Sequence, residues 1–198
     1  MEINAYYTLK NSSEGYYKDK GSKFIALAYP VESEQEAKEI LISVKTKYHD
    51  ARHHCYAYRI TPEKEFSRSS DDGEPSGTAG KPILNQLLSS ELYNAMIIVV
   101  RYFGGTKLGV SGLIKAYKEA SRDAILNNNI VKINITRQIE LTFAYPIMNQ
   151  VMRVIKEENF KIIEQDFASN CKIILEIKKN KKNIALIKFK KIQGVFIT

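Results

Sequence analysis

Residues Arg101–Gly112, with the sequence RYFGGTKLGVSG, form the segment best suited to bind a ligand. Glycine lets a backbone turn sharply and approach a ligand, and free N–H groups at the start of a helix attract an anion. Cationic side chains add charge-assisted hydrogen bonds to a phosphate or carboxylate. The candidate ligand-binding residues of this segment are Arg101, Tyr102, Gly104, Gly105, Lys107 and Gly109.

The same segment has a purely structural interpretation. A tight connection between a strand and a helix needs glycines for its geometry alone, and we give this interpretation equal weight with an anion or RNA-backbone contact. The spacing is not GxGxxG, which disfavours a dinucleotide. Gly80-Lys81-Pro82 also fails as a P-loop, because Pro75 and Pro82 stand where Gly and Ser or Thr are needed.

The triplet His53-His54-Cys55 contains residue types that bind zinc. If it lies in a strand, His53 and Cys55 share one face of the sheet and His54 lies on the other. A tetrahedral site needs further ligands, and His49 and Cys171 are the only other histidine and cysteine. We therefore expect packed or hydrogen-bonded histidines, and neither a metal nor a cofactor.

A nearby loop carries Asp71, Asp72 and Glu74, three carboxylates within four residues. Such groups can hold Mg²⁺, or perform acid–base chemistry when their environments separate their pKa values. The spacing is not that of an EF-hand, and Asp-Gly and Pro-Ser-Gly are strong turn signals. We favour a shaped turn, and keep as an alternative a hydrolase site formed by these carboxylates with His53 and His54.

Charge is distributed unevenly over the 198 residues, whose formal net charge is +8. Residues 1–131 contain 17 Lys and Arg against 16 Asp and Glu, whereas residues 132–198 contain 13 against 6. This asymmetry suggests an acidic partner such as RNA, although a solvated lysine-rich surface has the same composition. Phosphate contacts are expected from Lys178, Lys179, Lys181, Lys182, Lys188, Lys190 and Lys191.

Apolar periodicity predicts the elements that position these residues. A capping box at Ser33 and Glu36 starts a helix that ends near Tyr48. The almost continuously apolar Ala95–Phe103 is expected to be a central strand, buried on both faces. Further strands are predicted at 23–31, 53–61 and 65–70, and further helices from near residue 82 and from 113 to about 127.

From residue 130 the pattern starts again. A strand at 133–144, a helix at 146–158, an antiparallel pair at 160–167 and 171–177 joined by 168–170, and a helix at 184–192 are predicted, with a final strand at 195–198. This order is that of a small split βαβ sandwich. We predict an α+β protein with two domains, residues 1–131 and 132–198.

Several classes are disfavoured by composition. No window has the roughly 18–20 apolar residues that span a bilayer. The first residues lack a basic stretch followed by an apolar one, and two cysteines are too few for a disulfide scaffold. We therefore expect a soluble cytoplasmic protein with no membrane partner.

Three motifs together resemble the IMPACT/YigZ family across roughly residues 15–130. They are DARHHC at 50–55, DDGEPSGTAGKP at 71–82 and VRYFGGTKLG at 100–109, followed by Gly112-Leu113 and Ala116-Tyr117. KGSKF at 20–24, which contains the candidate residue Lys23, looks like the entry strand of that family. By position and element order, the second domain resembles that of bacterial YigZ-type members.

The resemblance implies a first domain similar to domain IV of elongation factor G, a ribosomal-protein-like fold. It implies a ferredoxin-like βαββα second domain, similar to domain V of the same factor. Eukaryotic members look like translational regulators that compete for an activator of a stress kinase. They carry an additional N-terminal domain for which this chain has no room, so we do not transfer the kinase role.

Our first hypothesis is therefore a non-enzymatic, translation-associated regulator or binding protein that contacts RNA, the ribosome or a translation factor. Tyr56, Tyr58 or Tyr102 would stack on bases if exposed, although we favour core positions for Tyr56 and Tyr58. The alternatives are the hydrolase described above and a protein-interaction module for an acidic partner.

Overall fold

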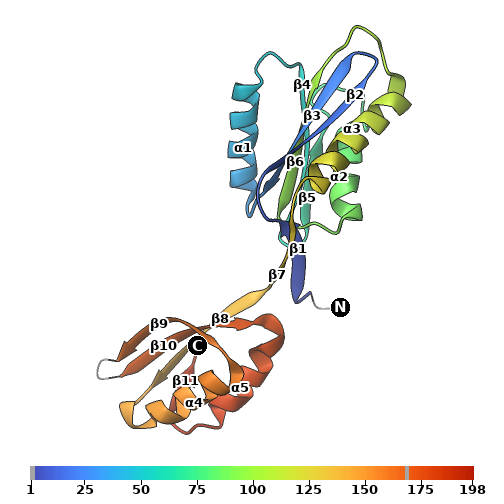
Figure 1. Ribbon diagram of the computed structural model, residues 1–198. Helices are drawn as coiled ribbons and strands as arrows, with labels where there is room; N and C mark the ends of the chain where they lie inside the picture. Colours follow the sequence, from blue (N-terminus) through green and yellow to red (C-terminus); the bar gives the residue numbers. More distant parts are fainter. Residues whose placement is uncertain (1–2, 168–169) are drawn as a thin grey trace. The chain divides into compact units, whose positions relative to one another are not determined.

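The computed structural model describes residues 3–167 and 170–198 (Figure 1). The chain divides into two compact units, Met1–Ile133 and Asn134–Thr198. Each unit contains its own sheet and helices, so the α+β class with two domains is confirmed.

A five-stranded antiparallel sheet forms the centre of the first unit. Its order is β2 (Ser13–Asp19), β3 (Ser22–Pro30), β6 (Ala95–Tyr102), β4 (His53–Ile60) and β5 (Phe66–Ser70). As predicted, β6 is the central strand, and its first seven residues are buried. Apolar side chains on both of its faces require cover on both sides of the sheet.

Three helices provide that cover (Figure 1). Helix α1 (Glu34–Lys47) lies on one face, where Ser33 accepts the Glu36 N–H as the predicted N-cap. Helices α2 (Gly80–Ser89) and α3 (Gly109–Leu126) lie on the other face. The alternation predicted for β4 is confirmed, because Cys55 belongs to the core beneath α2 and α3, whereas Tyr58 belongs to the core beneath α1.

Helix α3 begins at Gly109, earlier than the start predicted near Leu113. The low helix propensity of glycine led the prediction to place residues 104–112 in a turn. In the structure Leu113, Ala116, Tyr117 and Ala120 pack into the core, and this packing outweighs the intrinsic cost of Gly109 and Gly112. Gly109 has a φ of +74°, which suits glycine at the point where the chain enters the helix.

Two strands near the start of the chain were not predicted. One is β2, and the other is β1 (Ala5–Leu9), which pairs with β7 (Ile130–Asn134) in a separate two-stranded sheet. The prediction of a single strand at 133–144 was also wrong, because this segment is divided between β7 and β8 (Thr136–Phe143). The division falls at Ile135, whose carbonyl accepts the Lys179 N–H instead of a ladder bond.

The second unit has the ferredoxin-like order. Strand β8 is followed by a turn of 3₁₀ helix at Tyr145–Ile147, α4 (Met148–Glu158), β9 (Lys161–Phe167), β10 (Cys171–Lys178), another 3₁₀ turn at Lys179–Lys181, α5 (Lys182–Lys190) and β11 (Val195–Ile197). The antiparallel sheet has the order β11-β8-β10-β9. The final strand is confirmed, whereas the predicted connection at 168–170 falls partly outside the described residues.

Candidate anion-binding cleft

A cleft of about 530 Å³ opens where β6 ends and α3 begins. It is lined by the end of β6, the start of α3, the start of β4 and the acidic loop. The lining residues are Arg52, His53, Glu74, Pro75, Arg101, Phe103, Lys107, Leu108, Gly109, Val110 and Leu113. Five of the residues singled out in the sequence, His53, Glu74, Arg101, Lys107 and Gly109, therefore meet at one place.

Asp71 shapes the acidic loop from within. Its carboxylate accepts the backbone N–H groups of Gly77, Ala79 and Gly80 at 2.8, 2.9 and 2.8 Å. Burial alone would raise the pKa of Asp71, but these three donors outweigh burial and hold the pKa below its ordinary value. The carboxylate thus organises the turn that leads into α2.

Asp72 fixes the same loop to its neighbours. Its carboxylate accepts the His54 N–H at 2.7 Å and the Lys45 ammonium at 3.0 Å. Burial would raise the pKa of Asp72, yet these donors keep the pKa below its ordinary value. Its carbonyl lies 2.9 Å from Nδ1 of His53. The shaped turn favoured from the sequence is therefore present.

Glu74 is the centre of a buried polar network. One of its carboxylate oxygens, Oε1, accepts a hydrogen bond from the Arg101 guanidinium at 2.5 Å and another from the Tyr117 hydroxyl at 2.8 Å. Cys55 Sγ lies 3.3 Å from the same hydroxyl and 2.9 Å from the Asp71 carbonyl. Burial, reinforced by the neighbouring Cys55 and Glu74, raises the pKa of Tyr117 far above its ordinary value, and burial raises the pKa of Cys55 to about 12.

This network joins the acidic loop to the end of β6. Arg101 is 7% exposed, and its Nε is buried without a hydrogen-bond partner among the described residues. A buried donor without an acceptor is unfavourable by about 1–3 kcal/mol. Glu74 neutralises the guanidinium charge, so the net positive charge of the cleft comes from other residues.

Those residues are Arg52 and Lys107, which are exposed and form no ion pair with any residue that the structure describes. Beside them lies Phe103, a residue that is 55% exposed and whose ring centre lies 5.7 Å from the Arg101 guanidinium carbon. Arg52 and Phe103 were not among the sequence-based candidates. Both lie within motifs quoted above, DARHHC at 50–55 and VRYFGGTKLG at 100–109, and this position is the signal that would have found them.

Other predicted candidates lie outside the cleft. Tyr102 donates to Asp50 at 2.7 Å, an interaction that raises the pKa of its hydroxyl to about 12. Gly104 lies against the backbone of Gly21, where a Cβ would meet the Gly21 carbonyl carbon at 1.9 Å. Gly104 therefore has a structural role. Lys23 lies exposed on β3, opposite Tyr102 in the register, and Gly105 has open space around it.

The five residues of the hydrolase hypothesis do not share the cleft. His53 and Glu74 line it, whereas His54 is 6% exposed and its ring contacts the Tyr48 carbonyl at 3.0 Å. Asp71 and Asp72 are engaged as described above. Within residues 3–167 and 170–198, no three His, Cys, Asp or Glu side chains lie together in a way that could hold a metal ion.

Some lysines of the basic second unit form ion pairs within that unit. Lys188 lies 2.5 Å from the Glu158 carboxylate, and Lys181 lies 3.4 Å from it. Lys178 lines a separate hollow of about 440 Å³, together with Lys161, Lys181 and two glutamates. Lys179 lies in the 3₁₀ turn and Lys182 at the start of α5.

Comparison with known proteins identifies the family. The sequence of the Impact N-terminal domain matches residues 20–125, more than half of the chain. The chain therefore belongs to the IMPACT family.

Relatives extend the likeness beyond that domain. The chain is 31% identical to the IMPACT family member YvyE of Bacillus subtilis (strain 168) over 181 residues, which are 91% of this chain and 83% of YvyE. It is 34% identical to YigZ of Escherichia coli (strain K12), over 75% of this chain and 74% of YigZ. A crystal structure of a hypothetical protein, 27% identical, superimposes with a TM-score of 0.71 and covers 98% of this chain and 97% of that one.

None of the helices in the described part of the chain is long and apolar enough to cross a membrane.

Proposed function

We propose that this protein is a non-enzymatic, translation-associated regulator that contacts RNA through the cleft at the end of β6. Membership in the IMPACT family supports the translational role, because the motif resemblance implies that eukaryotic members regulate translation. The observation that carries the RNA contact is one hollow that combines an exposed aromatic residue with two exposed cations, neither of which forms an ion pair with a described residue.

Each part of the cleft has a role in such a contact. Arg52 and Lys107 would each neutralise a phosphate, and Phe103 would stack on a base, as aromatic rings do in proteins that bind single strands. The buried Arg101–Glu74 pair would hold the strand end and the acidic loop in position. The cations and the ring lie in short segments next to β4, β6 and α3, and short connections between packed elements limit the reordering needed on binding.

The hydrolase alternative has less support. The carboxylates that it requires accept hydrogen bonds from backbone N–H groups or from cations and a tyrosine of the protein itself. Both oxygens of Asp71 and of Asp72, and Oε1 of Glu74, are thus engaged in structural hydrogen bonds. Lysines of the second unit that are not paired with Glu158, such as Lys178 and Lys182, are proposed as additional phosphate contacts.

Fluorescence anisotropy of a labelled oligouridylate over a salt series tests the proposal. On a single strand, each lost phosphate contact reduces the slope of log K against log salt by about 0.7. We expect the double variant Arg52→Ala/Lys107→Ala to lose two such contacts. Phe103→Ala should weaken binding by about 1–3 kcal/mol with an unchanged slope. The matched control is Lys64→Ala/Lys115→Ala, which removes two exposed lysines that do not line the cleft.

A parallel arm uses co-sedimentation with purified ribosomes. Binding to ribosomes without binding to oligouridylate would replace the RNA contact with a protein contact on the translation machinery. Binding to neither at low salt would contradict the proposal, as would an equal loss in the cleft variant and its control.

A further inference from the structure

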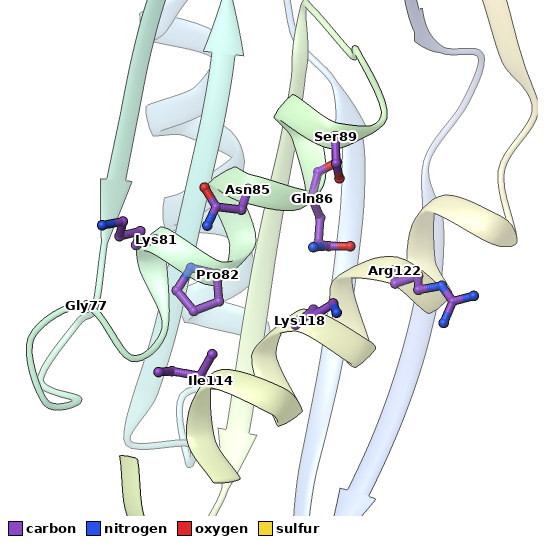
Figure 2. Close-up of a pocket in the computed structure, with 9 residues that line it drawn as sticks. All are labelled: Gly77, Lys81, Pro82, Asn85, Gln86, Ser89, Ile114, Lys118 and Arg122. Carbon is purple, nitrogen blue, oxygen red and sulfur yellow. The ribbon is translucent and has the colours of Figure 1, made fainter. Parts of the chain in front are cut away.

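A groove of about 760 Å³ runs between α2 and α3 on the first unit (Figure 2). Its lining residues are Gly77, Lys81, Pro82, Asn85, Gln86, Ser89, Ile114, Lys118 and Arg122. None of them lines the cleft at the end of β6. The groove is therefore a separate surface, and the argument for it does not depend on the proposed RNA contact.

The charge of this groove has one sign. Lys81 on α2 and Lys118 and Arg122 on α3 are exposed, and no acidic side chain is among the lining residues. Lys81 and Lys118 form no ion pair within the described part of the chain. Arg122 lies 3.5 Å from Glu119, but an exposed pair of this kind contributes little. Both walls thus favour an acidic ligand.

The floor of the groove is partly apolar. Figure 2 shows Pro82 of α2 and Ile114 of α3 facing each other across the space between the helices. Ile114 is 40% exposed, so its side chain offers apolar surface to a ligand. A ligand that covers Ile114 would remove this apolar surface from water, which is favourable.

The polar side chains of the groove suit a polypeptide. Asn85 and Gln86 carry amide groups, which both donate and accept hydrogen bonds and so match the N–H and C=O groups of a peptide backbone. In Figure 2 the Gln86 amide points from α2 towards α3. None of the described residues that line the groove is aromatic, so they offer no stacking surface of the kind that single-stranded nucleic acids use.

We infer that the α2–α3 groove binds an acidic segment of a partner protein. Carboxylates of the segment pair with Lys81, Lys118 and Arg122, and an apolar side chain lies against Pro82 and Ile114. The backbone of the segment forms hydrogen bonds with the amide groups of Asn85 and Gln86. The complementary charge steers the encounter and selects acidic partners, and the apolar contact adds affinity.

Titration of the full chain with a fluorescein-labelled peptide of alternating Glu and Leu tests this inference. We expect saturable binding that Lys81→Glu/Lys118→Glu weakens about tenfold or more, because two attractive contacts become repulsive. The matched control, Lys64→Glu/Lys115→Glu, makes the same change in charge outside the groove and should stay within about twofold of the unchanged protein. Ile114→Ser should weaken binding of the peptide without changing the net charge of the protein. Circular dichroism confirms that each variant is folded.

The outcomes are distinct. An equal loss in the groove variant and its control, or no saturable binding at low salt, would overturn the inference. If Lys81→Glu/Lys118→Glu abolishes oligouridylate binding and leaves the peptide unaffected, the groove belongs to nucleic acid and the inference is wrong. Failure of the RNA proposal would instead appear in the Arg52 and Lys107 variants, so the two proposals fail separately.

Discussion

Glu74 connects two motifs that lie far apart in the sequence. Because its ion pair with Arg101 is buried, replacing Glu74 is expected to lower the stability of the fold. Glu74→Gln removes the charge opposite Arg101, which is 7% exposed. Loss of one partner of a buried ion pair leaves an uncompensated charge and costs about 3–5 kcal/mol. We expect this decrease in the free energy of unfolding, measured by urea denaturation. Exposed Glu91→Gln is the control, and a decrease in Glu74→Gln no larger than that of Glu91→Gln would contradict the structural role of Glu74.

The lowered pKa of Asp71 predicts a specific pH dependence of the stability of the fold. A carboxyl whose folded pKa lies below the ordinary 3.8 stabilises the fold above that value, and the stabilisation disappears as the pH falls through the folded pKa. Asp71→Asn should therefore lose about 1–3 kcal/mol at neutral pH. The loss should shrink when unfolding is measured near pH 3 and below. Asp19→Asn, in the β2–β3 hairpin, is the control for loss of one carboxylate, and a constant difference between Asp71→Asn and the unchanged protein across the pH range would refute the prediction.

Cys55 and Cys171 are both fully buried, and burial raises the pKa of Cys55 to about 12. Burial shields both thiols from a reagent, and the raised pKa of Cys55 disfavours its thiolate, which is the reactive form. We expect a disulfide reagent at about pH 8 to label both cysteines in urea, and to label the native protein only as fast as it opens. Rapid labelling of one thiol without urea would show that the structure around it is wrong.

Among the site residues, sequence predicted those whose types alone suggest chemistry. The His53, acidic-loop and Arg101–Gly109 motifs were all selected, and five of their residues share the cleft. Sequence could not show that Arg101 pairs with Glu74, because this contact joins residues 27 positions apart through tertiary folding. It also could not distinguish Gly104, whose role is close backbone contact, from Gly109, which lines the cleft.

At the scale of elements, strong apolar periodicity predicted α1, β4, β6 and α4, whereas weaker patterns failed. Strand β2, with sequence SEGYYKD, has only one buried residue, and apolar and polar residue types do not alternate along it. What defines this strand is its pairing with β3 and its packing against α3. Neither contact can be inferred from a local window, because tertiary context overrides a weak propensity.

Gly15 is that one buried residue, and it sets how closely β2 approaches α3. A Cβ at this position would lie 2.1 Å from the Ala124 nitrogen, which is backbone and cannot rotate away. Gly15→Ala should therefore lower the free energy of unfolding by about 3 kcal/mol or more. The control is Gly77→Ala, which has a φ of +75° but open space, and which should cost about 1 kcal/mol. Equal effects in both variants would mean that α3 moves easily off the sheet.

At the scale of the whole molecule, each core draws its residues from one unit only. The two clusters of the first unit span Leu9 to Ile125, and that of the second spans Ile139 to Ile192. A domain with its own core can unfold without its neighbour, so opening need not involve the whole chain.

Leu141→Ala tests this independence. Leu141 is fully buried in the core of the second unit, and its truncation there costs about 2–5 kcal/mol. We expect hydrogen exchange, followed by mass spectrometry, to accelerate in peptides from 134–198 and to stay unchanged in those from 3–133. The reciprocal variant, Ile97→Ala in the first unit, should accelerate exchange in 3–133 only. Acceleration of both regions by either variant would show that the two units unfold as one, since a shared transition transmits a local loss of stability to every protected amide.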